Sequence, residues 1–151
     1  MTRSFALAAL LALACPPSAS ASLGGTAASV DADRVHMEGA LLRVTRADAY
    51  TVHELQSAAG TVVREFVSPG GTVFGVAWQG PWIPDMKQVL GDYFERYEAE
   101  LRSRAGRRRR GPVSIETPGL VVQMSGHQRS FSGRVYVPQL IPQGVETASI
   151  R

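Results

Sequence analysis

The feature that most limits the possible folds is a single amphipathic stripe in the middle of the chain. Its apolar side chains recur at steps of three or four residues, which places them on one face of an α-helix. The stripe consists of Met86, Val89, Leu90, Tyr93, Phe94, Tyr97 and Leu101. Asp85 precedes it and is suited to cap the first turn, and Pro112 prevents any continuation. The sequence therefore predicts one amphipathic helix, opened by Pro84 and Asp85.

Three extended segments precede this helix, at residues 50–56, 61–67 and 72–79, and they are rich in β-branched and aromatic residues. Gly60 ends the short link between the first two, which suits a hairpin turn with a positive φ. Along the third segment, simple alternation predicts two sets of side chains on opposite faces. One set is Phe74, Val76 and Trp78, and the other is Val73, Gly75 and Ala77.

Three more extended segments follow the helix, at residues 113–116, 120–125 and 130–137, with a turn expected at residues 126–128. Short links imply antiparallel neighbours, and a single helix can cover one face of a sheet. We therefore expect an α+β fold in which an antiparallel sheet of about six strands, in the order β-β-β-α-β-β-β, packs on one amphipathic helix. Residues 34–46 fit either a strand or a short helix.

The first 21 residues have the pattern of a cleavable secretory signal. Arg3 supplies a positive charge, residues 5–14 carry no polar side chain, and residues 19–21 offer a small-residue cleavage site. The apolar run is shorter than the roughly 20 residues that a membrane-spanning helix needs, so no transmembrane segment is expected. We expect a Sec-type signal peptide, cleavage after Ala21, and export to the periplasm or the medium.

Cleavage at that point would leave one domain of ordinary size. Residues 22–47, whose start is rich in Gly, Ala and Ser, are expected to form an N-terminal arm, and residues 48–142 a single α+β domain. Residues 143–151 are expected to form a C-terminal tail.

Cys15 is the only cysteine, and it has two interpretations. Its position after Ala14 resembles a lipid-attachment site, which would make the protein a lipid-anchored envelope lipoprotein. The interpretation that we prefer is that Cys15 is removed with the signal peptide, because residues 19–21 offer a conventional cleavage site downstream. The mature chain would then contain no disulfide.

The basic character of the chain is local. The chain has 16 basic and 13 acidic residues, and one uninterrupted run contributes four of the basic ones: Arg107, Arg108, Arg109 and Arg110. No aromatic residue is interleaved with this run, so nucleic-acid binding is not expected. At most, we expect this arginine run to make a weak contact with an anionic surface.

The chain resembles a family of small exported bacterial proteins that is known only as domain of unknown function 2844. The resemblance is carried by several short segments: Leu23-Gly24-Gly25, Tyr50-Thr51-Val52-His53-Glu54, Val63-Arg64-Glu65-Phe66, Ser68-Pro69-Gly70-Gly71, Val73 through Pro81, Pro84-Asp85, Leu90 through Phe94, Gly126-His127-Gln128-Arg129 and Phe131-Ser132-Gly133. It covers nearly all of the chain after residue 21. The resemblance implies an exported proteobacterial protein and brings no activity and no site residues.

No catalytic or metal-binding motif stands out. The spacings of His36, His53 and His127 match no zinc motif, so neither a metal nor another cofactor is expected. There is no G-x-S-x-G sequence. Two catalytic pairs remain imaginable. One is His127 as a base beside Ser125 or Ser130, and the other is an acid–base pair of Glu54 and Glu65 on paired strands. An envelope hydrolase that uses His127 with nearby Ser or Glu residues is therefore the alternative function.

Two tryptophans flank a Gly-Pro bend at the end of the third extended segment, and they are the most distinctive binding candidates. Trp78 and Trp82 could offer a stacking platform for a sugar ring, a peptide or a partner protein. The alternative is a packing role, which we prefer for Trp78 and leave open for Trp82. We add His53, His127 and Arg129 as further candidate binding residues. The function expected from the sequence is a small periplasmic or secreted binding module, whose partner is an envelope protein or small ligand.

Overall fold

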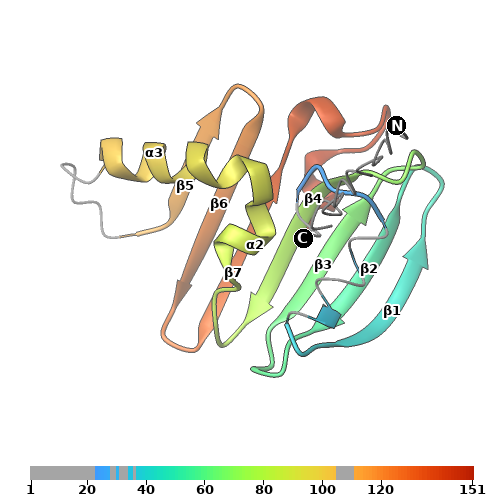
Figure 1. Ribbon diagram of the computed structural model, residues 1–151, viewed down its shortest axis with the longest axis horizontal. Helices are drawn as coiled ribbons and strands as arrows, with labels where there is room; N and C mark the ends of the chain where they lie inside the picture. The colour runs from blue at the N-terminus through green and yellow to red at the C-terminus, as the bar shows by residue number, and fades with distance from the viewer. Residues whose placement is uncertain (1–22, 28–29, 31–33, 36, 105–110) are drawn as a thin grey trace, which may run out of the picture.

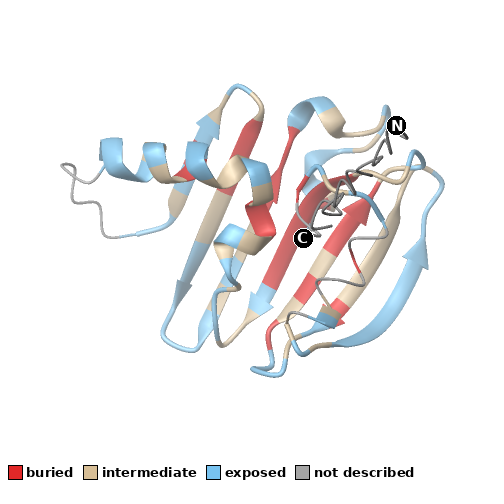
Figure 2. Cartoon of the chain, in the orientation of Figure 1, coloured by how far each residue is buried: buried red, intermediate tan, exposed pale blue. Residues whose placement is uncertain are grey.

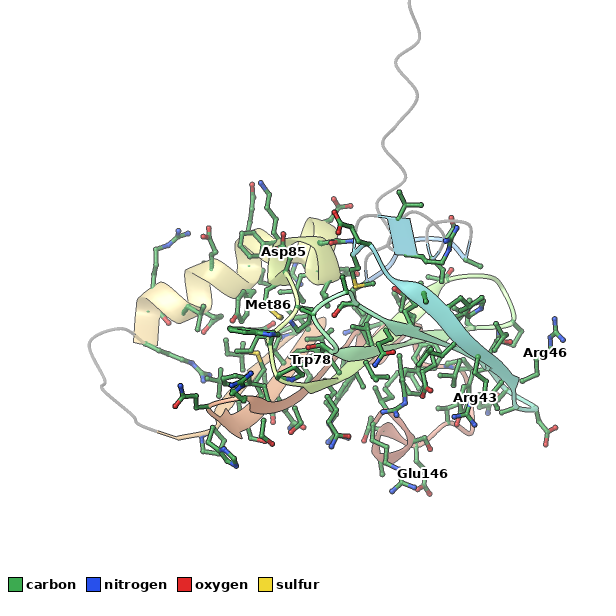
Figure 3. All side chains as sticks on the ribbon, turned by 90° about the horizontal axis from the view of Figure 1, so that it is seen from below. Arg43, Arg46, Trp78, Asp85, Met86 and Glu146 are labelled. Carbon is green, nitrogen blue, oxygen red and sulfur yellow. The ribbon has the colours of Figure 1, made fainter. Side chains whose placement is uncertain are left out.

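The computed structural model describes residues 23–27, 30, 34–35, 37–104 and 111–151. They form a seven-stranded antiparallel sheet in the order β1-β2-β3-β4-β7-β6-β5. Helices cover one face of the sheet, and the C-terminal segment, residues 138–151, lies on the other (Figures 1 and 3). The predicted α+β class is confirmed, with one strand more than expected. The predicted signal peptide with Cys15, His36 and the arginine run 107–110 lie outside the described residues.

The first four strands form consecutive hairpins. They are β1 (Ala40–Arg46), β2 (Thr51–Gln56), β3 (Val62–Val67) and β4 (Val73–Gly80). Gly60 has a φ of 87° in the β2–β3 turn, as expected for a glycine at that position. The ambiguous segment before residue 47 forms the edge strand β1, so part of the expected N-terminal arm belongs to the sheet.

The helices carry the chain from β4 to the far edge of the sheet, and the last strands bring it back (Figure 1). These strands are β5 (Val113–Thr117), β6 (Leu120–His127) and β7 (Ser130–Tyr136), and β7 pairs with β4. The turn expected at residues 126–128 is wrong by two positions. Pairing continues to His127 opposite Ser130, and Arg129 adopts a φ of 63° in the turn itself.

The predicted amphipathic helix is confirmed, and a 3₁₀ turn interrupts it. It consists of α2 (Met86–Leu90), the 3₁₀ turn η1 (Gly91–Tyr93) and α3 (Phe94–Arg104). Gly91 has φ 50° and ψ −123°, a conformation that other residues rarely adopt, and it ends α2. The predicted cap is confirmed, because the Asp85 carboxylate accepts a hydrogen bond from the Lys87 backbone N–H at 2.9 Å.

A β-bulge in β4 overturns the predicted grouping of its side chains. Phe66 pairs with Gly75, but the next residue of β3 pairs with Val73, so Phe74 is an extra residue in the ladder. Phe74 consequently packs with Ala77 on one face, whereas Val73 packs with Val76 and Trp78 on the other. Strict alternation fails because the bulge shifts the register by one residue.

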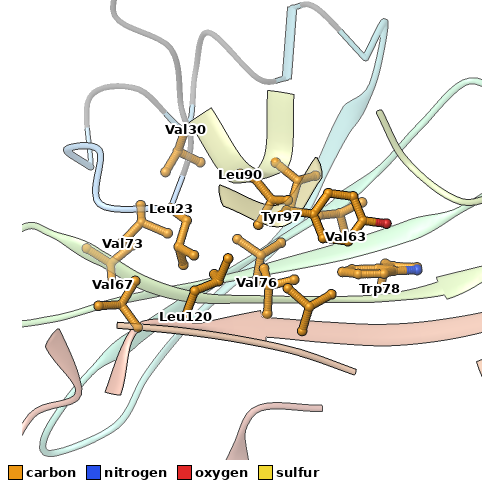
Figure 4. Packing of buried hydrophobic residues seen from close by; sticks show 14 of the residues in the cluster. Leu23, Val30, Val63, Val67, Val73, Val76, Trp78, Leu90, Tyr97 and Leu120 are labelled. Atoms are coloured by element: carbon orange, nitrogen blue, oxygen red, sulfur yellow. The ribbon is translucent and has the colours of Figure 1, made fainter. Parts of the chain in front are cut away.

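The larger hydrophobic core lies between the sheet and the helices, on what we call the helix face. Val89 and Leu90 of α2 and Tyr97 of α3 pack there on buried sheet residues such as Val63 and Trp78 (Figure 4). Burial is concentrated in the central strands, whereas β1 and much of α3 are exposed (Figure 2). No helix among the described residues is long and apolar enough to cross a bilayer.

The opposite face, which we call the second face, carries a smaller core. Its buried members are Phe66, Phe74, Ala77, Val121, Tyr136 and Ile150. Ile150 belongs to the C-terminal segment and is fully buried. Its side chain occupies the space beside Gly75, where an added Cβ would lie only 3.2 Å from it. The end of the chain therefore covers part of the second face, a role that sequence analysis did not assign to it.

Candidate functional site

The two tryptophans have different environments. Trp78 is 2% exposed and lies flat against Gly133 of β7, where even a Cβ would come within 2.3 Å of the indole ring. Trp82 is 58% exposed. The hydroxyl of Thr61 donates to the Trp82 carbonyl at 2.8 Å and accepts from its backbone N–H at 3.3 Å. Thr61 therefore fixes the backbone of Trp82 and leaves the indole exposed.

Trp82 forms one wall of a small pocket of about 270 Å³ on the helix face. Met37, Ile83 and Pro84 add apolar surface, and Ser57 and Asp85 add polar groups. The Asp85 carboxylate is already engaged, because it accepts a hydrogen bond at the start of α2. The pocket is able to hold a small apolar group, but it presents no charged side chain besides Asp85.

His53 and the two glutamates of the β2–β3 hairpin do not form an acid–base pair. His53 lies opposite the buried Glu65 on the helix face, and both side chains have interaction partners. Glu54 lies opposite Arg64, and because side chains alternate along a strand it points to the second face. The imagined pairing of Glu54 with Glu65 is therefore excluded, since the sheet separates the two carboxylates.

His127 and Arg129 lie at the exposed β6–β7 turn, far from the other candidates. Four strand intervals separate β6 from β2, which places His127 at least about 19 Å from His53. The Ser125 hydroxyl lies 3.3 Å from that of Ser132 and makes no hydrogen bond to His127. The five predicted residues are thus distributed over three places, and within the described part of the chain no cluster suited to a metal ion occurs.

A hollow of about 570 Å³ lies on the second face, beside the C-terminal segment. We call it the arginine hollow. Two neighbouring rows of side chains line it: Arg64, Arg134, Gln123 and Ser114 in one row, and Gln79, Ser132 and Ser125 in the next. The lining is completed by Trp78, Pro112, Val113, Met124 and Gly133, and by Ile150 and Arg151 of the C-terminal segment. The hollow therefore presents positively charged side chains on a lining that is largely apolar.

Arg134 is the most constrained cation in this hollow. Its Nε donates to the Gln123 side-chain oxygen at 2.8 Å, and one terminal nitrogen donates to the carbonyl of Thr147 at 2.8 Å and to that of Ile150 at 3.4 Å. The guanidinium also lies 5.8 Å from the centre of the Tyr136 ring. Among the described residues no carboxylate pairs with it, so its positive charge is fixed in place and not neutralised.

Arg64 contributes a second cation, which is partly neutralised. Its Nε donates to the Glu54 carboxylate at 2.7 Å, and Arg43 approaches the other carboxylate oxygen at 3.4 Å. The hydrogen bond from Arg64 and the charges of both arginines lower the pKa of Glu54 below its ordinary value. Glu54 therefore stays ionised and holds Arg64 at the margin of the hollow.

Residues 19–150 match the family described as "Protein of unknown function (DUF2844)". The chain belongs to this family. The match spans the whole sheet of the DUF2844 chain together with its C-terminal segment, and it confirms the family resemblance seen in the sequence. No curated protein and no solved structure matches the chain.

Sequence reasoning missed the arginine hollow of this DUF2844 protein. Arg64, Arg134 and Gln79 belong to three different strands, and only the order in which those strands pair brings them together. One signal was available: the alternation along residues 130–137 places Arg134 on the same face as two serines. That pattern is equally typical of an ordinary solvent-exposed strand face, so it did not indicate a site.

Proposed function

We propose that this DUF2844 protein is an exported binding module that holds an oxyanion-bearing ligand in the arginine hollow. The observation that supports this proposal best is the environment of Arg134, a guanidinium held by three hydrogen bonds without an anionic partner among the described residues. A half-buried cation in a hollow is costly unless an anion accompanies it. A bound carboxylate, sulfate or phosphate would remove that cost.

The immobilised guanidinium also favours affinity. The planar fork of arginine matches an oxyanion, and a side chain that is already ordered loses little further entropy on binding. Arg64 lies on the opposite side of Ala77 in the same row, so an anion in the hollow would interact with both cations. A charge-assisted hydrogen bond of this kind contributes about 1.5–3 kcal/mol.

Polar groups in the remaining lining offer hydrogen bonds to the rest of the ligand, beside apolar side chains such as Val113 and Met124. Gln79, Ser125 and Ser132 present amide and hydroxyl groups along the hollow, and Gln79 and both serines are exposed. Such groups bind hydroxylated molecules better than apolar ones, because burying them without hydrogen bonds is unfavourable. The ligand class that we propose is therefore a polar molecule with at least one oxyanion.

The experiment that tests this function is titration calorimetry with galacturonate, with neutral galactose as the control ligand. Arg64→Gln removes one cation of the hollow and should weaken galacturonate binding by about 10- to 100-fold. Arg46→Gln is the matched control, because it removes the same charge from a β1 residue whose side chain points to the helix face. Inorganic phosphate and sulfate, titrated separately, identify the preferred oxyanion.

Equal affinity for galacturonate and galactose would contradict the proposal, as would equal weakening by the two substitutions. Absence of binding by galacturonate, phosphate and sulfate alike would also overturn it. Circular dichroism of both variants checks that the sheet is retained.

Export is part of the same proposal, and the N-terminal sequence pattern supports it. Mass spectrometry of the protein recovered from an expressing bacterium should show a mature chain that begins at Ser22. A chain that begins at a lipid-modified Cys15 would favour the lipoprotein alternative. A chain that still begins at Met1 would contradict export.

A further inference from the structure

Three arginines lie in one line across the second face of the sheet, and we call them the arginine row: Arg43, Arg64 and Arg134. The strand register aligns them, because Arg43 lies opposite Glu54, Glu54 opposite Arg64, Arg64 opposite Ala77, and Ala77 opposite Arg134. Two strand intervals separate each arginine from the next, or about 10 Å along the row. The row therefore extends beyond the arginine hollow to the β1 edge.

The cations of the row have hydrogen-bonding capacity left. Arg64 uses its Nε on Glu54, and its terminal nitrogens donate to no described residue. Arg43 uses one terminal nitrogen on the same carboxylate, and its side chain is 68% exposed. One carboxylate thus balances two guanidinium groups, so this part of the row keeps a positive charge. Arg134 adds a second positive charge at the other end.

The surroundings of the row discriminate between kinds of polyanion. The one aromatic residue that lines the hollow, Trp78, is buried on the helix face, so no described ring in the hollow is available to stack on bases. An extended peptide binds most readily at a sheet edge through its backbone, whereas the row crosses the middle of a face. Amide and hydroxyl groups flank the row instead, from Gln79, Gln123 and Ser132.

From this arrangement we infer that the arginine row binds a linear polysaccharide that carries carboxylates and lies across the strands. The inference rests on the proposed function, since the arginine hollow is one end of the row. Several weak carboxylate–arginine contacts along one chain act together, so affinity rises with the number of sugars that span the row. Because the contacts are exposed, that affinity falls with added salt.

The test is a length series of galacturonic acid, from the monomer to the trimer and the hexamer, titrated calorimetrically against the full mature chain. The hexamer should bind at least roughly tenfold more tightly than the monomer. Arg43→Gln should weaken binding of the hexamer more than binding of the monomer, because Arg43 lies outside the hollow. Arg46→Gln again serves as the matched control, and a methyl-esterified hexamer controls for charge.

Three results would overturn the inference. They are equal affinity for monomer and hexamer, no effect of Arg43→Gln on the hexamer, and tighter binding of single-stranded DNA or polyglutamate of similar length. If the monomer still binds and remains sensitive to Arg64→Gln, the proposed function survives and only the extension along the row is lost. Thermal unfolding of Arg43→Gln should match that of the parent protein, since the side chain is exposed.

Discussion

At the scale of single residues, the clearest structural requirement is the missing side chain at Gly133. The indole of Trp78 occupies the space where a Cβ would be, at 2.3 Å. Gly133→Ala should therefore displace Trp78 and destabilise the protein by about 1–3 kcal/mol or more. Gly70→Ala is the control, because its nearest neighbour is 3.8 Å away, and it should be nearly neutral. Urea unfolding compares them, and equal stability of the two variants would contradict this packing.

Glu54 gives a prediction for pH dependence. Its folded-state pKa is lowered, chiefly by the hydrogen bond from Arg64, so its ionised form stabilises the folded state. This contribution is present above the ordinary glutamate pKa of 4.5 and is lost as the pH falls below it. Glu54→Gln should therefore be less stable than the parent at pH 7, and the difference should shrink below pH 4.5.

Denaturant unfolding at several pH values measures this difference. Glu95→Gln on the exposed face of α3 is the control, and it should show no such convergence with the parent protein. A stability difference for Glu54→Gln that stays constant down to low pH would show that the ion pair is not its origin.

Residue types alone did not determine individual environments. Both tryptophans were candidates for binding, with a packing role preferred for Trp78, and the structure buries Trp78 against Gly133 and leaves Trp82 exposed. The difference depends on a neighbouring strand that is about 55 residues away in the sequence, so no local pattern carries it. The same holds for Arg134, whose partners Gln123 and Thr147 come from two other segments.

At the scale of elements, Gly91 determines how the helical segment meets the sheet. It allows α2 to end and α3 to begin in a new direction, because its φ of 50° with ψ of −123° is accessible mainly to glycine. Gly91→Ala should cost about 1–2 kcal/mol of stability. Glu95→Ala, at an exposed position of α3, should change it by less than about 0.5 kcal/mol. Thermal unfolding measures both, and an unchanged midpoint for Gly91→Ala would argue against the break.

The C-terminal segment is a structural element, and its anchor is Ile150. This side chain is fully buried against Gly75 on the second face. Ile150→Ala should destabilise the protein by about 2–5 kcal/mol, because it removes a buried apolar group and leaves a cavity. The exposed Ala148, substituted by Ser, is the control and should have little effect. If both variants unfold at the same denaturant concentration, the segment does not contribute to the core.

The elements that could be predicted are those with strong local signals. Turn residues such as Gly60 and Gly119 have positive φ and separate the strands that composition indicated. The bulge at Phe74 and the packing of Ile150 had no such signal, because both depend on which surfaces meet in three dimensions. The edge strand β1 was ambiguous for a similar reason: its exposed side chains lack a clear alternation between buried and exposed positions.

At the scale of the whole molecule, the two faces of the sheet have different roles. The helix face is closed by α2 and α3 over a large apolar core, whereas the C-terminal segment covers only part of the second face (Figures 2 and 3). The arginine hollow lies beside this segment, whose Ile150 and Arg151 help to line it, and the arginine row continues from the hollow to the β1 edge. We therefore assign stability to the helix face and ligand binding to the second face.

Chemical-shift mapping of the backbone amides during titration with galacturonate tests this assignment most directly. We expect the largest shifts at Gln79, Gln123, Ser132 and Arg134, which line the hollow, and unchanged amides around Trp82. Shifts confined to the Trp82 pocket on the helix face, with none in the arginine hollow, would contradict the account.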